Sequence, residues 1–283
     1  MKIHALSTGT VRIKSAMRHG RGRGLARQVN MLLDRTWTEP LPIYAWAIEH
    51  PEGVIVVDTG ELASARPLPF ARFDIQPEDE IGPQLGRLGI KASDVRKVIL
   101  THLHGDHMDG MRHFPNSEIL VEASEYQNMQ GWRGWLARSS AAQPWPSWFA
   151  PTLVAFAPVP HGAFSHSHAV TASGDVVLVP TPGHTHGHMS VVVSDGEVSY
   201  FLAGDASYNQ QLLLEQQIDG VGSDPAAALQ TLRTILRYAQ EHPTVYLPAH
   251  DPAAAQRLAA QTILPMEARS SAARRTGLGM MAA

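Results

Sequence analysis

Residues 101–110 have the sequence Thr-His-Leu-His-Gly-Asp-His-Met-Asp-Gly, with three histidines and one aspartate inside six consecutive positions. An apolar run at residues 98–100 directly precedes this stretch, so we expect the cluster to lie where a buried strand opens into a loop. The alternative interpretation is a polar loop that is merely rich in histidine, since the chain has 15 histidines in all.

The spacing within the stretch favours a metal site over that alternative. On an extended chain His102 and His104 lie on the same side, because side chains alternate with a period of two. A turn at Gly105 can then bring Asp106 and His107 to a second point close by. Nitrogen and carboxylate ligands without sulfur suit zinc and its first-row neighbours.

The composition bounds the size of the core and the class of partner. A chain of 283 residues with 44% hydrophobic residues fits one large domain or two small ones, with a sizeable core. Its net charge of -3 argues against nucleic acid or an anionic membrane as the main partner and favours small neutral substrates. The absence of cysteine excludes disulfides, thiolate nucleophiles and sulfur-ligated zinc.

The two ends of the chain predict a cytoplasmic protein with a short tail. Residues 1–10 carry no apolar stretch of the kind found in a secretory signal, and no apolar run is long enough for a transmembrane helix. Residues 265–283 are small, basic and polar, so we expect a loosely ordered tail after a single domain of residues 1–264.

Apolar runs and turn residues predict the secondary structure. Residues 43–48 and 54–57 predict a hairpin, and residues 61–76 predict a loop. We expect one or two short strands at residues 3–13, broken at Gly9, and further strands at residues 98–100, 119–121, 176–179, 189–193, 198–202 and 244–247. We expect helices at residues 77–88, at 122–130, and from 225 onward with Ser223 or Asp224 as its cap.

The same arrangement recurs along the chain: a short β-rich run followed at once by a polar residue that can bind metal. It occurs at Asp58, His102, His184, Asp205 and His250. Strand ends that converge on one edge of a sheet arrangement would gather all five into a shared site. Asp58 has two open roles, which are to hydrogen-bond a metal-ligating histidine or to cap a turn or helix.

Two further segments have open interpretations. Residues 18–27 are basic and glycine-rich, and either cradle an anionic group or form a mobile surface loop. Residues 132–149 hold four of the six tryptophans. This segment predicts a lid or wall over an apolar pocket, a subunit contact compatible with a homodimer, or a small satellite core.

The motifs together resemble those of the metallo-β-lactamase fold hydrolases. The resemblance covers roughly residues 40–255, through Asp58-Thr59-Gly60, the stretch 102–107, Thr181-Pro182-Gly183-His184-Thr185, Gly204-Asp205 and His250. It implies an α/β fold, the αββα sandwich, in which two mixed β-sheets lie face to face and helices flank them.

The resemblance also implies a dinuclear metal site. By it, one ion would be bound by His102, His104 and His184, the other by Asp106, His107 and His250, and Asp205 would bridge them. The expected cofactor is two divalent ions per chain, with zinc foremost and cobalt, manganese or iron(II) as alternatives. His188 is expected to support the ligands, and His186 to face solvent.

A finer resemblance is to the N-acyl homoserine lactonases. It depends mainly on Asp205-Ala206-Ser207-Tyr208, since a tyrosine three residues after the bridging aspartate is the catalytic tyrosine of that family. The alternative for Tyr208 is a packed core residue. Two departures concern the acyl-chain pocket: the longer tryptophan-rich segment, and Gly105, where these lactonases often have a bulky aromatic residue.

The expected function is therefore opening of the lactone ring of an N-acyl homoserine lactone, which is quorum quenching, by a metal-bridging hydroxide. Tyr208 would stabilise the developing oxyanion, and Asp106 would carry a proton to the departing alkoxide. The alternatives are other hydrolases of this fold, namely a pyridoxolactone-type lactonase, a glyoxalase II-type thioesterase or a phosphotriesterase. An inactive metal-binding protein is the non-enzymatic alternative.

Overall fold

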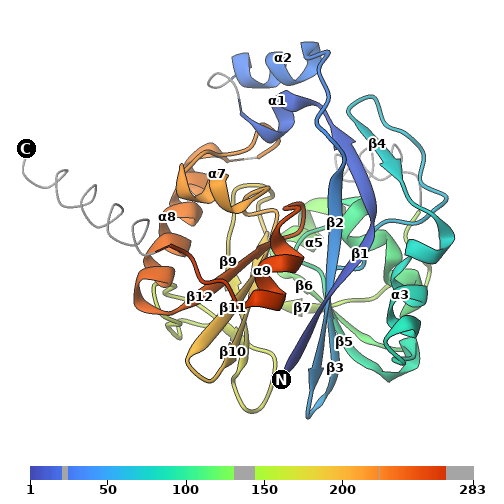
Figure 1. The fold of residues 1–283 in the computed structure, drawn as a ribbon, viewed down its shortest axis with the longest axis vertical. Coiled ribbons are helices and arrows are strands. Elements are labelled where there is room, and N and C mark those ends of the chain that lie inside the picture. The colour runs from blue at the N-terminus through green and yellow to red at the C-terminus, as the bar shows by residue number, and fades with distance from the viewer. Residues whose placement is uncertain (21–24, 131–143, 223, 266–283) are drawn as a thin grey trace, which may run out of the picture.

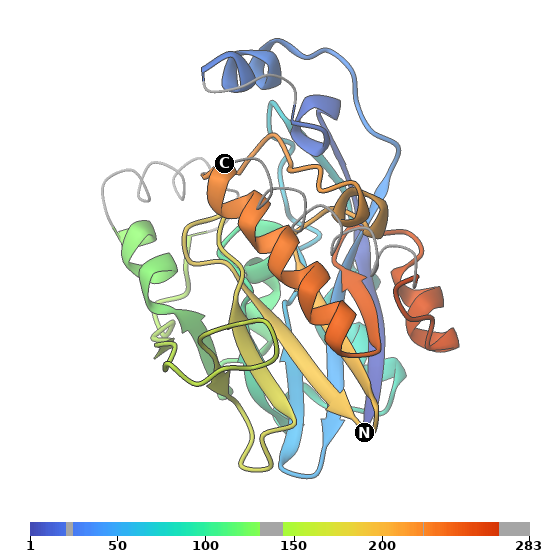
Figure 2. The ribbon, with the colours of Figure 1, turned by 90° about the vertical axis from the view of Figure 1, so that its left-hand side faces the viewer.

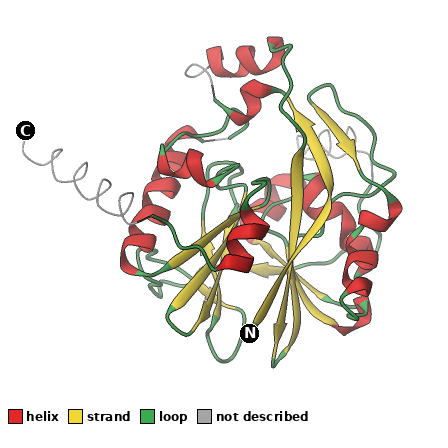
Figure 3. Cartoon of the chain, in the orientation of Figure 1, coloured by secondary structure: helices red, strands yellow, loops and turns green. Residues whose placement is uncertain are grey.

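Two β-sheets lie face to face and helices cover their outer sides (Figures 1 and 3). The structure is a computed structural model, and it describes residues 1–20, 25–130, 144–222 and 224–265. The first sheet has the strand order β4-β1-β2-β3-β5-β6-β7. Its strands are β1 (Lys2–Ile13), β2 (Leu41–His50), β3 (Gly53–Val57), β4 (Ala71–Asp74), β5 (Val95–Ile99), β6 (Glu118–Glu122) and β7 (Thr152–Val154).

The second sheet has the strand order β12-β11-β10-β9-β8. Its strands are β8 (His168–Ala169), β9 (Val176–Pro180), β10 (Met189–Asp195), β11 (Val198–Gly204) and β12 (Thr244–Pro248). Both sheets are mixed, because β3, β5, β6 and β7 pair in parallel, as do β11 and β12, whereas the other pairs are antiparallel.

Helices and 3₁₀ turns connect the strands. The α-helices are α1 (Ser15–Arg18), α2 (Leu25–Leu33), α3 (Ile81–Arg87), α4 (Gly105–Met108), α5 (Ala123–Gln130), α7 (Gln210–Leu214), α8 (Pro225–Glu241) and α9 (Ala254–Ala260). The 3₁₀ turns are η1 (Pro77–Asp79), η2 (Ala92–Asp94) and η3 (Asp109–His113). Asp224 caps α8, since its carboxylate accepts the backbone N–H groups of Ala226 and Ala227.

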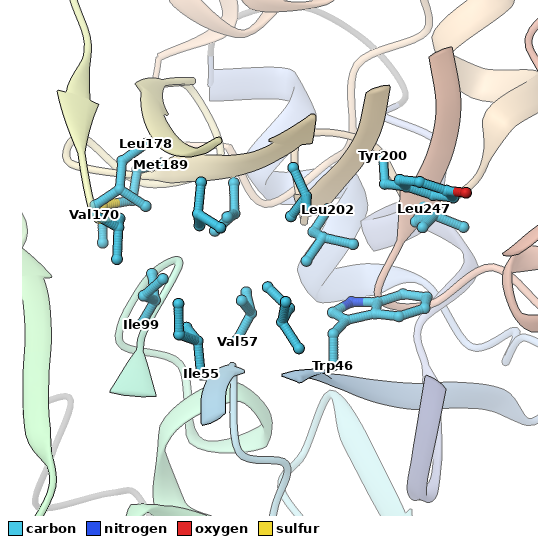
Figure 4. Packing of buried hydrophobic residues seen from close by; sticks show 14 of the residues in the cluster. Trp46, Ile55, Val57, Ile99, Val170, Leu178, Met189, Tyr200, Leu202 and Leu247 are labelled. Atoms are coloured by element: carbon cyan, nitrogen blue, oxygen red, sulfur yellow. The ribbon is translucent and has the colours of Figure 1, made fainter. Parts of the chain in front are cut away.

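The main core fills the space between the two sheets (Figure 4). Trp46 and Val57 of the first sheet face Leu202 and Leu247 of the second, and all four side chains are buried. Burial of this apolar surface provides the main driving force for pairing the sheets.

The continuous apolar run of β9 is explained by burial on both faces of its sheet. Leu178 points into the core between the sheets, whereas its neighbours Val177 and Val179 pack against Leu232 and Ile235 of α8. Figure 2 shows α8 lying across the outer face of this sheet. The predicted αββα sandwich is confirmed.

The strand directions bring the predicted metal-binding residues to one edge. β3 and β5 are parallel, and so are β9, β11 and β12, because β10 is antiparallel to both β9 and β11. The carboxyl ends of these parallel strands therefore share an edge within each sheet, and the loops that follow them emerge there.

The prediction of a loop at residues 61–76 is wrong in part. Residues Ala71–Asp74 form an edge strand, β4, which pairs with the end of β1 and places Phe73 opposite Val11. The strand has the alternating sequence Ala-Arg-Phe-Asp but is only four residues long. This is the shortest length at which alternation indicates a strand, and the pairing with β1 completes the element.

The single helix predicted for residues 77–88 is divided in the structure. The 3₁₀ turn η1 and helix α3 are separated by Glu80, which has an extended ψ of 153°. Pro83 lacks an N–H group and fits only the first turn of a helix, and a helix that begins at Ile81 places it there.

Residues 3–13 form one strand and not two. The break predicted at Gly9 is a register shift between Ser7 and Thr10, where Gly9 has a φ of +109°. In the basic segment 18–27, Arg18 ends α1 and Arg27 belongs to α2, while residues 21–24 lie outside the described chain. The predicted tail also lies outside it from residue 266 onward. Of the helices that the structure describes, none has the length and apolar character needed to cross a bilayer.

Candidate metal centre and active site

Three histidines form the first group of converging donor atoms. His104 Nδ1 lies 2.9 Å from Nε2 of His102 and 3.1 Å from Nε2 of His184. His102 and His104 come from the loop after β5 in one sheet, and His184 comes from the loop after β9 in the other. The group therefore joins the two halves of the sandwich.

A second group lies next to the first, with Asp205 between them. Asp106 Oδ2 lies 3.5 Å from Nε2 of His250. Asp205 Oδ1 lies 3.4 Å from Nε2 of both His107 and His250, and its Oδ2 lies 3.4 Å from Nε2 of His184. The structure therefore brings all seven predicted ligands together, and Asp205 faces both groups.

Asp58 supports one of these histidines. It follows β3 with a left-handed φ of +56°, which is unusual for a residue other than glycine. Its carboxylate accepts Nδ1–H of His107 at 2.8 Å, and the backbone N–H and hydroxyl of Thr101 at 2.8 and 2.9 Å. With Nδ1 of His107 occupied in this way, Nε2 is free to face the metal-binding cluster.

Two other histidines are oriented in the same manner. His184 Nδ1 donates to Oδ2 of Asp219 at 2.7 Å, and His250 Nδ1 donates to the carbonyl of Pro42 at 2.8 Å. Each bond leaves Nε2 of the ring for the cluster. Asp219 lies in the chain between α7 and α8, and no motif in the sequence marks it.

His188 and Glu125 hold the surrounding backbone. His188 Nε2 accepts the backbone N–H of Asp205 at 3.0 Å, in agreement with its expected supporting role, and His186 is exposed as expected. Glu125 accepts the backbone N–H groups of Leu103 and Gly187 at 3.2 and 3.0 Å. Glu125 thus ties together the loops that follow β5 and β9, a role that could not be foreseen from its place in a polar helix.

The protonation preferences of the cluster fit a bound cation. Burial and His107 lower the pKa of His102 well below its usual range, and burial and His184 lower that of His104 to about 4. Burial also acts to lower the pKa of His107, but Asp205 and Asp58 outweigh it and raise that pKa. A divalent cation would take the place of this proton.

Two buried atoms at the centre of the cluster give an independent sign of fit. Nε2 of His107 and Oδ1 of Asp205 are enclosed and have no hydrogen-bond partner within the described chain. Buried polar atoms are rarely left without a partner. Imidazole nitrogens and carboxylates that converge on such atoms form a donor set suited to zinc or a similar divalent ion.

Tyr208 lies beside both groups of ligands. Its ring stacks on His250 at 5.5 Å and meets the edge of His184 at 6.3 Å, and only 5% of its surface is exposed. Burial and the charge of Asp205 raise the pKa of Tyr208 well above its usual range, so the phenol stays protonated and can donate a hydrogen bond.

An apolar cavity of about 340 Å³ opens from the metal-binding cluster. Its wall includes Tyr208, His184 and Asp205, and beyond them mainly aliphatic, aromatic and methionine side chains. Trp145 forms part of the wall and stacks on Tyr126 at 5.7 Å, while its edge meets Phe149. Of the roles predicted for the tryptophan-rich segment, a pocket wall is found at Trp145. Trp132 and Trp135 lie outside the described residues, and a homodimer contact stays a prediction.

Two buried carboxyl groups, Glu61 and Asp109, also line the cavity. A Cβ added at Gly105 would stand 2.8 Å from Glu61 Oε2 and 3.4 Å from Asp109 Oδ2. The space beside Gly105 is therefore occupied by these carboxyls and not by an aromatic ring. Burial and Asp109 raise the pKa of Glu61 to about 9.

This pKa predicts how Glu61 affects stability. The folded protein holds the Glu61 proton more tightly than the unfolded chain, so the contribution of Glu61 is fully present below about pH 4.5 and is lost as pH rises towards 9. Glu61→Gln carries no titrating proton. The free energy of unfolding of Glu61→Gln should therefore rise by about 5 kcal/mol relative to that of wild type between about pH 5 and about pH 9.

Denaturant unfolding of the metal-loaded proteins at several pH values checks this expectation. Glu215→Gln, which alters an exposed glutamate at the end of α7, is the matched control. The difference between its free energy of unfolding and that of wild type should not change with pH. A difference that is equally independent of pH for Glu61→Gln would contradict the raised pKa of Glu61.

The comparison with known proteins agrees with the fold. Residues 38–250 match the metallo-beta-lactamase superfamily, and the chain belongs to that superfamily. It is 24% identical over 267 residues to the N-acyl homoserine lactonase AttM of Agrobacterium fabrum, with 89% of this chain and 94% of AttM covered. The predicted family resemblance is confirmed.

Two solved structures show the same fold. An N-acyl homoserine lactone hydrolase with N-hexanoyl-L-homoserine bound at its catalytic metal centre has a TM-score of 0.70 and 22% identity, over 89% of this chain and 93% of that one. AidC, a dizinc quorum-quenching lactonase, has a TM-score of 0.63 and 16% identity, over 88% and 87% of the two chains.

Proposed function

We propose that this chain is a metal-dependent hydrolase that opens the lactone ring of N-acyl homoserine lactones and so quenches quorum signals. The observation that carries this proposal is the position of Tyr208, a protonated phenol that stacks beside two predicted metal ligands and lines an apolar cavity. The likeness to the lactonase AttM and to the lactone hydrolase structure supports it.

The proposed ligand set is the one expected from the sequence. His102, His104 and His184 would hold one divalent cation, Asp106, His107 and His250 a second, and Asp205 would be shared. Zinc is proposed first for both. When bound, such ions supply a hydroxide nucleophile near neutral pH and polarise an ester carbonyl.

The chain's own residues would then orient the substrate and handle charge and protons. The Tyr208 hydroxyl would donate a hydrogen bond to the lactone carbonyl oxygen and stabilise the negative charge that develops there. Asp106, which faces His250, would hold a proton and pass it to the alkoxide that leaves as the ring opens. The apolar wall, including Trp145, would bind the acyl chain and exclude water.

A substrate panel tests this function. Purified metal-loaded protein should open N-acyl homoserine lactones of several chain lengths at least tenfold faster, in kcat/KM, than it hydrolyses a thioester or a phosphotriester, since each tenfold preference needs only about 1.4 kcal/mol of transition-state binding. The measurement is initial rate by pH-stat together with metal content. Faster turnover of either control ester would assign a different hydrolase activity, and two bound metals without any turnover would favour a binding protein.

A further inference from the structure

The cap, defined as α1 (Ser15–Arg18) and α2 (Leu25–Leu33), lies at the top of the molecule in Figure 1, above the upper ends of β1 and β2. Met17 of α1 and Met31 of α2 line the same cavity as Tyr208 and pack in one apolar cluster with it. An acyl chain in this cavity would therefore contact the cap at one end and the metal-binding cluster at the other.

The cap is anchored on residues 218–222, which connect α7 to α8. The backbone N–H of Gly220 donates to the carbonyl of Met17 at 2.6 Å, and the N–H of Gly20 donates to the carbonyl of Ile218 at 3.3 Å. A Cβ at Gly220 would collide with the carbonyl oxygen of Ala16, so the two segments pack with their backbones in contact.

Arg27 adds a side-chain link from α2 to the same segment. Its guanidinium is buried, donates to the backbone carbonyl of Asp219, and lies 3.5 Å from Oδ1 of that residue. The other carboxylate oxygen of Asp219 accepts Nδ1–H of His184 at 2.7 Å. Arg27, Asp219 and His184 thus form a continuous chain from the cap to a ring whose Nε2 faces His104 and Asp205.

We propose that Arg27 is a positioning residue which couples the cap to His184 through Asp219. The proposal rests on the proposed function, because the ligand beneath the cap is taken to be the acyl chain of a lactone or of its ring-opened product. An acyl chain bound under the cap would hold Arg27 and Asp219 in place, and Asp219 would in turn hold the His184 ring in position to bind a cation. Because coupling between two binding sites is reciprocal, a bound cation would also strengthen binding of the acyl chain.

Zinc retention measures this coupling without relying on turnover. The full-length zinc-loaded protein is mixed with a chelator in the presence of saturating N-decanoyl-homoserine or N-butanoyl-homoserine, and the rate of zinc loss is recorded. Both products share the head group at the metals, and only the longer chain extends towards the cap. In wild type the decanoyl product should slow zinc loss about fivefold more than the butanoyl product, at the lower end of common coupling strengths.

Arg27→Met should remove this extra protection and leave the protection by the butanoyl product unchanged. Arg27→Lys keeps the positive charge and should restore part of it. Arg35→Met, which removes an exposed arginine just beyond α2, is the matched control and should behave like wild type. An unchanged ratio of decanoyl to butanoyl protection in Arg27→Met would overturn the proposal.

Asp219→Asn interrupts the same series of contacts without changing a residue of α1 or α2, and should abolish the extra protection even if Arg27→Met folds poorly. Retention of the full decanoyl advantage in Asp219→Asn would also contradict the coupling. A wild-type protein that neither opens the lactones nor is protected by their products would instead overturn the proposed function, so the two failures are distinguishable.

Discussion

Asp205→Asn is expected to lose both metal sites together and to lower kcat/KM on lactones by at least about 10³-fold, a loss of about 4 kcal/mol in transition-state stabilisation. Asp205 is the one proposed ligand whose two oxygens face different groups: Oδ2 faces His184, and Oδ1 faces His107 and His250. Asparagine keeps the shape but has one oxygen donor and no charge. It therefore cannot serve both groups at once.

Metal analysis of the purified variant, alongside initial rates, checks this expectation. Asp195→Asn makes the same chemical change at the far end of β10, away from the cluster, and should keep about two metals per chain and normal turnover. Full retention of both ions by Asp205→Asn would refute the shared carboxylate. Loss of one ion alone would assign Asp205 to a single site.

The convergence of the site could be predicted because it follows from buried parallel strands. Apolar runs such as 54–57 and 176–179 are continuous, since each strand is covered on both faces, and the polar residue after each run is conspicuous. Parallel directions then place Asp58 and His184 at the same edge of their respective sheets. The apolar run and the polar residue that follows it are local properties, so the sequence contains them, whereas the strand directions are set by the fold.

The residues that orient the ligands depend on packing between distant segments. Asp219 reaches His184 across 35 positions, and Glu125 reaches Gly187 across 62. Glu61 and Asp109 come together because the loop after β3 lies beside η3. Asp109 belongs to the stretch 101–110, so a place near the metal-binding cluster could have been expected for it, but its contact with Glu61 could not. β4 is only four residues long and depends on β1 for its pairing, so the wall of the cavity was less predictable than its chemistry.

Tyr208→Phe is expected to lower kcat on lactones by about 10²- to 10³-fold and to leave the metal content at its wild-type value, since a single oxyanion donor in an enclosed site contributes this much. The ring itself should remain in place, because it packs with Ile43 and Leu212 and stacks on His250 through its aromatic face. Only the hydroxyl is lost. The effect should therefore fall on turnover and not on folding.

The pH profile tests whether the phenol of Tyr208 acts in its protonated form. Burial and Asp205 hold the pKa of Tyr208 well above its usual range, so the phenol donates throughout ordinary working pH, and the ratio of wild-type to Tyr208→Phe rates should stay flat from about pH 6 to about pH 9. Tyr200→Phe is the matched control, because Tyr200 lies near the start of β11, remote from the cluster. The variant loses a hydroxyl that accepts a hydrogen bond from Gln261, and it should retain full activity. Metal loss in Tyr208→Phe would mean that the hydroxyl supports the ligands His184 and His250, and the loss of turnover could then not be assigned to an oxyanion donor.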